Sequence, residues 1–338
     1  MDSVSQAVLG AAVGEVVLGS RVGNKAILWG AVAGTIPDLD VLAYPLMDQI
    51  SQLSWHRGPS HAFFYLILAA PIMAWVINRL HKGKATWRHW TLLLLLAFIT
   101  HVLLDSFTVY GTQLFRPFSH FPVGFNSISI VDPLYTVPLL IAVVVALFLK
   151  RNSRRRLRLI IAGLALSTLY LGITVGFKFH VNAVAQDNFV RQNIRAEKYM
   201  TAPTLLNSVL WRITAKVEDG FKVGYYSLLD SDRDIEFSYL PQRDSLLLPV
   251  RHTEALARLE WFSRGYYVVS ESEGELHFAD IRFGTIDVGQ PDSRRFVFQW
   301  KIKETPARPE RGEITQSEFK IDDPGRVFDN LWRRVLEK

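Results

Sequence analysis

The 338-residue chain contains no cysteine. Disulfide bridges and thiolate metal ligands are therefore excluded, so a metal site would have to use histidine nitrogens and carboxylate oxygens. The beginning, Met1-Asp2-Ser3, lacks the basic residues of a cleaved signal peptide, and we do not expect one here. The chain also lacks internal repeats and low-complexity tracts, which excludes a repeat architecture.

From about His180 onward the chain has no apolar run long enough to cross a bilayer. Before that point such runs dominate, and they raise the mean hydropathy of the whole chain to +0.14. We predict a polytopic α-helical membrane domain over residues 1–179, followed by a soluble α+β domain over 180–338. About five to six membrane segments are expected. The first two are short enough to be re-entrant instead of spanning.

The predicted membrane segments are separated by turn residues or basic loops. They are Val4–Leu18, Ala26–Ile36, Ala62–Asn78, Thr91–Val109, Asp132–Leu149 and Leu159–Phe177. Asp132 precedes Pro133, the order typical of a helix N-cap followed by proline at the first helical position. The stretch from Val41 to Trp55 is predicted to be a loop or interfacial segment.

The net charge of +6 is concentrated in loops between the apolar runs. The loops 79–88 and 150–158 carry most of the lysines and arginines that precede His180, a pattern of membrane topology and not of nucleic-acid binding. Placing both loops in the cytoplasm puts the loops around 56–61 and 110–132 outside, together with the region from His180. We therefore expect a multi-pass membrane protein whose C-terminal domain lies outside the cytoplasm and binds no nucleic acid.

The C-terminal region has the pattern of a compact α+β domain. Aromatic and β-branched residues predict strands, and two amphipathic stretches predict helices. The strands are Ser208–Val217, Phe221–Leu229, Glu275–Phe283 and Arg295–Lys303, and the helices are Glu254–Phe262 and Val327–Leu336. No motif in this region indicates a particular function.

Two ionisable residues lie inside the apolar run Thr91–Val109. His101 and Asp105 are four positions apart, so on a helix they share one face. A charged group in hydrocarbon is costly unless it is paired or solvated, which marks such residues as functional candidates. The alternative is a packed polar pair that joins helices.

Other histidines and carboxylates fall on the same membrane face in this topology. Asp38 and Asp40 follow Pro37, and in an extended stretch their side chains point the same way. Ser60 is a suitable N-cap for a helix beginning at His61. The seven candidate metal ligands are Asp38, Asp40, His56, His61, His101, Asp105 and Asp132.

Mixed histidine and aspartate ligands suit Zn²⁺, Mn²⁺ or Fe²⁺. Zinc is the preferred ion and manganese the alternative. Seven candidates exceed the four ligands of a structural zinc, which indicates either two ions or one ion with outer carboxylates that orient histidines. Asp38 and Asp132 have the alternative of serving as helix-end caps, and His56 that of an interfacial histidine.

We predict two catalytic residues, Arg57 and Asp105. Arg57 lies between His56 and His61, where its guanidinium could bind an anionic phosphate or carboxylate. The alternative for Arg57 is an interfacial arginine beside lipid headgroups. Asp105 would ligate the ion or orient a ligand within the apolar helix.

These motifs resemble those of the YdjM-like family, bacterial inner-membrane proteins described as metal-dependent hydrolases. The family pattern of Pro-Asp-x-Asp, His-Arg-Gly-x-Thr-His, Thr-His-x-x-x-Asp and Asp-Pro is similar to the motifs at 37–40, 56–61, 100–105 and 132–133, and the opening residues 1–10 also look alike. Ser60 stands where threonine is usual and keeps the hydroxyl. The resemblance covers about residues 1–180 and implies metal binding in the bacterial inner membrane.

The residues and the resemblance together favour a hydrolase with its site at the outer membrane face. Membrane lipid would be a partner, and the substrate would be a phosphoester or a lipid-linked molecule, which leaves small-molecule and lipid-linked substrates both open. A transporter or a metal-binding protein without hydrolytic activity is the alternative, although a transporter should place polar groups near the midplane and on both sides. In a third interpretation, the membrane domain is a structural anchor and the C-terminal domain carries the function.

The predicted topology can be tested by cysteine labelling, since the natural chain has no cysteine to interfere. A cysteine introduced at His81 should resist an impermeant thiol reagent in intact cells, because its loop is cytoplasmic. A cysteine introduced at Gly124 should react. Labelling at position 81 but not at 124 would invert the topology and place the candidate site in the cytoplasm.

Overall fold

The structure is a computed structural model that describes the chain except for residues 82–83, 273, 287–294, 304–309, 318–322 and 338. Lys82, one of the residues in the basic loop 79–88, thus lies outside the described residues. The chain forms two compact units. The first comprises Met1–Ala43, Trp55–Gly176 and Leu205–Asn207, and the second comprises Tyr44–Ser54, Phe177–Thr204 and Ser208–Lys338.

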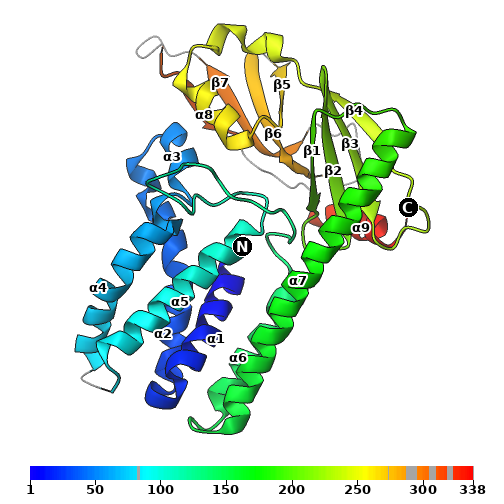
Figure 1. The fold of residues 1–338 in the computed structure, drawn as a ribbon. Helices are drawn as coiled ribbons and strands as arrows, with labels where there is room; N and C mark the ends of the chain where they lie inside the picture. The colour runs from blue at the N-terminus through cyan, green and yellow to red at the C-terminus, as the bar shows by residue number, and fades with distance from the viewer. Residues whose placement is uncertain (82–83, 273, 287–294, 304–309, 318–322, 338) are drawn as a thin grey trace. The chain divides into compact units, whose positions relative to one another are not determined.

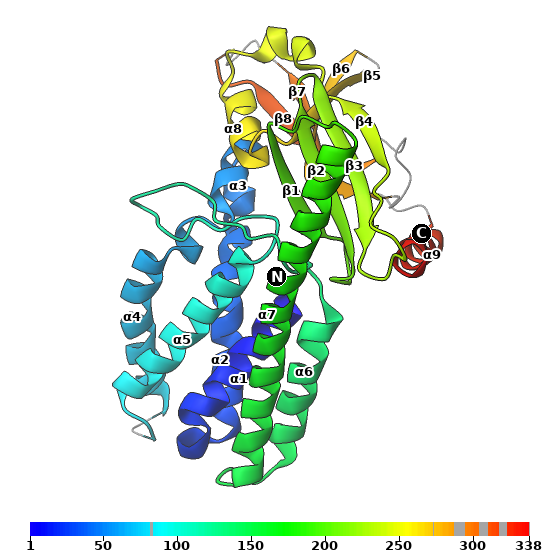
Figure 2. The same ribbon diagram turned by 45° about the vertical axis from the view of Figure 1, so that its right-hand side comes forward.

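The first unit is a helical bundle (Figures 1 and 2). Its helices are α1 (Ser3–Val22), α2 (Asn24–Thr35), α4 (Phe63–His81), α5 (Trp87–Ser106), α6 (Pro133–Phe148) and the first part of α7 (Arg154–Arg191). In the part of the chain that the structure describes, five segments are long and apolar enough to cross a membrane, namely α1, Asn24–Leu46, α4, α5 and α7. Helix α6 is shorter, with 16 residues. With the two sheets described below, these helices confirm the predicted fold class.

Helices α1 and α2 form an antiparallel hairpin in which the two backbones touch. Each helix carries two glycines four residues apart, Gly10 and Gly14 on α1 and Gly30 and Gly34 on α2. A Cβ atom on Gly30 would lie 2.2 Å from the carbonyl oxygen of Gly10, closer than a real Cβ atom approaches. Small residues at this spacing let membrane helices pack through their backbones.

Helix α1 is also tied to α7 by a buried ion pair. Arg156 donates from Nε and Nη2 to the two carboxylate oxygens of Glu15, each at 2.6 Å. Its Nη1 donates to the side chain of Asn24 at 2.7 Å. Both charges are almost fully buried, so each depends on the other to offset its desolvation.

Three local expectations were wrong. Residues Ile36–Leu46 form a 3₁₀ helix, η1, so Asp38 and Asp40 do not lie on an extended stretch with parallel side chains. The segment Val41–Trp55, expected as a loop or an interfacial segment, contains the helix α3 (Gln49–Trp55), so the loop alternative was wrong. Residues Pro59–His61 form a 3₁₀ turn, η2, and Ala62 after it is extended, so α4 begins only at Phe63. The Ser60 hydroxyl donates to Asp40.

The second unit holds two four-stranded antiparallel sheets in simple sequential order. The first sheet contains β1 (Lys198–Pro203), β2 (Leu210–Val217), β3 (Gly220–Ser227) and β4 (Phe237–Pro241). The second contains β5 (Tyr267–Ser272), β6 (Glu275–Thr285), β7 (Phe296–Lys303) and β8 (Glu313–Gln316). The 3₁₀ helix η3 (Asp244–Val250) and the helices α8 (Glu254–Ser263) and α9 (Pro324–Leu336) also belong to this unit, as do most of α3 and the end of α7.

The four predicted strands correspond to β2, β3, β6 and β7, and the two predicted helices to α8 and α9. The strands β1, β4, β5 and β8 were missed because they are short, with four to six residues each. The end of α7 supplies part of the core of this unit. Val181, Val184 and Ala185 pack with Trp211 and Ile213 of β2, so α7 continues beyond the predicted end at Phe177 to cover this sheet.

The close contact between α1 and α2 predicts a strong effect of a single methyl group. Gly30→Ala should lower the free energy of unfolding by about 1–3 kcal/mol, because the new Cβ atom collides with the backbone of α1. The matched control is Gly172→Ala on α7, where a Cβ atom would meet no atom within 4 Å. That control should be neutral or stabilising by up to about 1 kcal/mol. Reversible unfolding in mixed micelles measures both, and equal stabilities would refute the backbone contact.

Candidate metal centre

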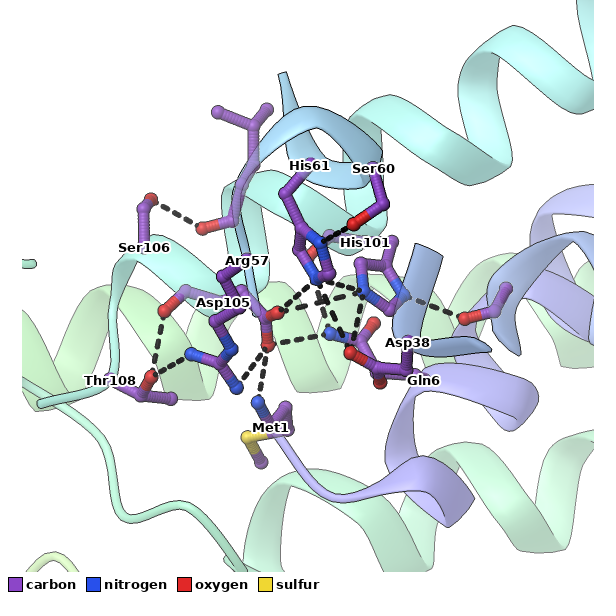
Figure 3. Close-up of polar contacts among 12 residues, drawn as sticks. Met1, Gln6, Asp38, Arg57, Ser60, His61, His101, Asp105, Ser106 and Thr108 are labelled. Carbon is purple, nitrogen blue, oxygen red and sulfur yellow. Dashed lines mark hydrogen bonds and ion pairs between the residues drawn. The ribbon is translucent and has the colours of Figure 1, made fainter. Parts of the chain in front are cut away.

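Four side chains of the first unit gather around one point (Figure 3). Asp38 comes from η1, His61 from η2, and His101 and Asp105 from α5. One ligand atom from each residue lies within 4.8 Å of the ligand atoms of all the others. His61, His101 and Asp105 have fully buried side chains, whereas that of Asp38 is 19% exposed. This cluster could hold a metal ion.

The spacing of the ligand atoms matches tetrahedral coordination. Zinc bonds of about 2.0–2.1 Å require ligand atoms about 3.3–3.4 Å apart. The two Nε2 atoms of His61 and His101 are 3.2 Å apart. Asp38 Oδ1 lies 3.2 Å from Nε2 of His61 and 3.6 Å from Nε2 of His101. Asp105 Oδ2 lies 3.2 Å and 3.5 Å from the same two atoms. Five of the six tetrahedral edges thus have a suitable length.

The far side of each imidazole is held by a hydrogen-bond acceptor. His101 Nδ1 lies 2.6 Å from the carbonyl oxygen of Gly34, which can only accept, so Nδ1 carries the proton. His61 Nδ1 lies 2.9 Å from the hydroxyl of Ser60. That hydroxyl donates to a carboxylate oxygen of Asp40, so it accepts from His61. This network assigns both neutral histidines the tautomer with Nε2 unprotonated.

Four lone pairs consequently face one another in the centre of the cluster. They belong to the Nε2 atoms of His61 and His101, Oδ1 of Asp38 and Oδ2 of Asp105. Asp105 Oδ2 is buried without a hydrogen-bond partner. Such an arrangement is repulsive unless a cation lies between the groups or the histidines take up further protons. The residues present therefore fit a divalent metal ion.

The other oxygen of Asp105 is turned away from the histidines and is neutralised there. Gln6 Nε2 donates to Oδ1 at 2.9 Å, Arg57 Nη2 lies 3.1 Å from it, and the amino group of Met1 contacts it as well. The two oxygens thus have separate tasks. Oδ1 is fixed by donors of the protein, which leaves Oδ2 directed at the histidines.

Three of the seven predicted ligands lie outside the group of four. Asp40 accepts from His56 Nδ1 at 2.9 Å, from the backbone N–H of Arg57 at 3.0 Å and from Ser60 at 2.9 Å, so it organises the loop that carries His61. His56 is connected to the cluster through Asp40 and through its ring contact with His61, with ring centres 6.1 Å apart. Asp132 caps α6 through the backbone N–H of Leu134, as its cap alternative requires, and accepts from Tyr170. The four remaining residues favour one ion over two.

Arg57 is buried beside the cluster in a left-handed backbone conformation, with φ of 54°. Its Nη1 donates to the Thr108 hydroxyl at 2.9 Å, its Nη2 pairs with Asp105, and its guanidinium lies 5.0 Å from the ring centre of Tyr110. A non-glycine residue there costs about 1–3 kcal/mol, which the contacts on both sides offset. Arg57 thus neutralises Asp105, and binding of a substrate anion stays a prediction.

Sequence reasoning missed Gln6, Thr108 and the Gly34 carbonyl as parts of this site. Gln6 is fully buried and also donates to the backbone oxygen of His101 at 3.2 Å. The sequence alone could have indicated Gln6, since a glutamine within an apolar helix needs a polar partner. The Gly34 carbonyl had no such signal, because a backbone atom leaves no trace in the residue pattern.

Fold and site define a multi-pass membrane protein with a buried histidine–aspartate cluster at the ends of its helices. A model of the YdjM inner membrane protein family matches residues 1–181, so the chain belongs to this family and is an inner-membrane protein. The resemblance noted in the motifs is thereby confirmed. YfhP of Bacillus subtilis (strain 168), described as an uncharacterized protein, is 28% identical over 236 residues, which cover 66% of this chain and 68% of YfhP. No solved structure matches the chain.

The cluster predicts a defined response of metal content to substitution. Asp105→Asn and His101→Ala should abolish stoichiometric metal in the purified protein, because each removes a central ligand. Ser60→Ala leaves the four ligands in place but removes the acceptor behind His61 and the hydrogen bond to Asp40, so it should weaken metal affinity about 10–100-fold. Elemental analysis per folded protein and a competition titration with a chelator measure these effects.

The matched control is His120→Ala, which removes an exposed histidine of the same unit that lies outside the cluster. It should keep the metal content of the natural protein. Removal of a buried charge can itself change stability, so only folded, monodisperse protein is compared. Full metal occupancy in Asp105→Asn would reduce the cluster to a structural polar network.

Proposed function

We propose that the protein is a membrane-bound, metal-dependent hydrolase that acts on a phosphoester, with a lipid-linked substrate as the preferred class. The single observation that carries the proposal is the group of four ligand atoms at tetrahedral spacing, backed by acceptors that fix both imidazoles. Zinc is the proposed ion because the spacing is tetrahedral and the ligands are nitrogen and oxygen. Manganese is the alternative.

Three of the four candidate ligands are fully buried, and the fourth is partly exposed. His61, His101 and Asp105 would hold the ion from the protein side, and Asp38 would close the site on its partly exposed side. Zinc in enzymes has three protein ligands and a fourth, exchangeable position. Asp38 is therefore the residue expected to make room for water or substrate.

The bound ion would supply Lewis-acid chemistry and a nucleophile at neutral pH. The protein's own residues orient and balance this site. Arg57 and Gln6 hold Asp105 in place, and Ser60 holds His61. In the proposed mechanism Arg57 also supplies positive charge close to the position of a phosphate, which would be stabilised as its charge grows.

A lipid-linked substrate is supported by the loop that follows α5. This loop exposes large apolar side chains, with Phe115 at 53%, Phe118 at 82% and Phe121 at 64% exposure. Phe118 packs against Phe64 of α4, with ring centres 5.8 Å apart, and Phe64 is itself exposed on a membrane-spanning helix. The apolar surface of the helix thus continues into the loop that follows Asp105, as a site supplied from the lipid phase requires.

A second candidate is a metal-binding protein or transporter without hydrolytic activity. The observation in its favour is that four protein ligands complete a tetrahedral shell, which is the arrangement of structural zinc sites. The two functions differ in Asp38. A closed site needs Asp38 to retain the ion, whereas a hydrolase needs Asp38 to yield a position during turnover.

The proposal is tested with purified protein in lipid nanodiscs loaded with zinc. A panel of fluorogenic phosphoesters and carboxylic esters, water-soluble and lipid-linked, is assayed alongside uptake of radioactive zinc into proteoliposomes. We expect metal-dependent hydrolysis, lost by at least about 100-fold in His61→Ala and retained in His120→Ala. Stoichiometric metal with zinc uptake and no hydrolysis of any substrate in the panel would establish the transporter instead.

A further inference from the structure

The second unit contains a buried cluster of positive charge that the proposed function does not use. Arg212 on β2 and Arg282 on β6 are 6% and 2% exposed, and Asp280 on β6 is fully buried. Arg264, at the end of α8, is partly buried. Among the residues that the structure describes, three arginines thus lie near one carboxylate.

Among the described residues, Asp280 accepts hydrogen bonds from Arg282. Arg282 donates from Nε to Oδ1 at 3.1 Å and from Nη2 to Oδ2 at 2.6 Å, and its backbone N–H donates to Oδ1 at 2.9 Å. The two residues are two positions apart on β6, so their side chains lie on the same face of the strand. Arg212 and Arg264 have no comparable carboxylate partner in the described part of the chain.

Arg212 and Arg264 come from two other elements. Arg264 lies two residues before Tyr266, whose carbonyl oxygen accepts from the backbone N–H of Ile281, between Asp280 and Arg282, at 3.0 Å. Arg212 Nη2 donates to the carbonyl oxygen of Arg282, and its Nη1 lies over Gly284, where a Cβ atom would be only 2.2 Å away. Burial, followed by the charge of Arg282, lowers the pKa of Arg264 to about 10. Burial also lowers the pKa of Arg212. Both guanidinium groups are therefore held in an environment that penalises their charge.

Several buried donor atoms in this cluster have no hydrogen-bond partner among the residues that the structure describes. They are Nε of Arg212, Nε and Nη2 of Arg264, and Oγ1 of Thr214, which lies two positions after Arg212 on the same face of β2. Neither Arg212 nor Arg264 forms an ion pair with a described carboxylate within 4 Å. Unsatisfied buried donors and unpaired buried charge each cost free energy, and an anion would relieve both.

We propose that the second unit binds a small oxyanion, of the phosphate or carboxylate class, between Arg212 and Arg264. Guanidinium groups present paired N–H donors that match the oxygens of such anions, and the Thr214 hydroxyl adds a neutral donor. The partial exposure of Arg264 provides the access route. This site is separate from the metal centre, since all of its residues belong to the second unit.

The test is equilibrium dialysis of the full-length protein against radiolabelled inorganic phosphate. Excess EDTA is present, so that a metal ion in the first unit cannot contribute. The natural protein should bind one phosphate per chain in a saturable manner, and inorganic sulfate should compete. Arg264→Met should weaken binding at least about tenfold, because it removes one charge and two donors.

Two further variants keep the result decisive. Arg251→Met removes an exposed arginine of the same unit and should leave phosphate binding unchanged. Thr214→Val keeps the size of the side chain and should weaken binding severalfold, even if an arginine variant fails to fold. Absence of saturable binding at millimolar phosphate, or equal binding by the natural protein and the Thr214→Val and Arg264→Met variants, would overturn the proposal.

Discussion

The buried carboxylate of Asp105 is the constraint on which the first unit depends. An ionised carboxylate inside an apolar helix is stable only if other groups surround it. The chain supplies those groups from distant segments, with Gln6 from α1, Arg57 and His61 from the segment before α4, and His101 from the same helix. The bundle must therefore bring α1, η2 and α5 together for this one charge to be tolerated.

The glycine contact between α1 and α2 gives this arrangement its rigidity. Because Gly10, Gly14 and Gly30 allow the two backbones to touch, α2 ends with the Gly34 carbonyl in reach of His101. The 3₁₀ helix η1, which follows α2, then places Asp38 beside His61 and Asp40 beside the Ser60 hydroxyl. Helix packing and ligand orientation are thus parts of the same structure, and a loss of either should loosen the other.

The sequence predicted the residues of the centre better than their roles. All four residues were among the seven candidates, since charged residues are rare in apolar segments and the motifs at 37–40 and 56–61 flank them. The patterns did not separate these four from Asp40, His56 and Asp132, which lie outside the group. The distinct tasks of Asp38 and Asp40 were not predictable, since they depend on 3₁₀ geometry that an extended stretch does not share. Arg212 and Arg282 escaped notice because they are 70 residues apart and meet only between strands of different sheets.

The central claim is that one ion is shared by two imidazoles and two carboxylates. X-ray absorption spectroscopy at the zinc edge of the loaded, purified protein measures this most directly. The account predicts four nitrogen or oxygen ligands at about 2.0–2.1 Å, two of them with the multiple scattering of imidazole. A folded protein that takes up no zinc, so that protons alone balance the four side chains, or a bound ion without imidazole ligands, would contradict it.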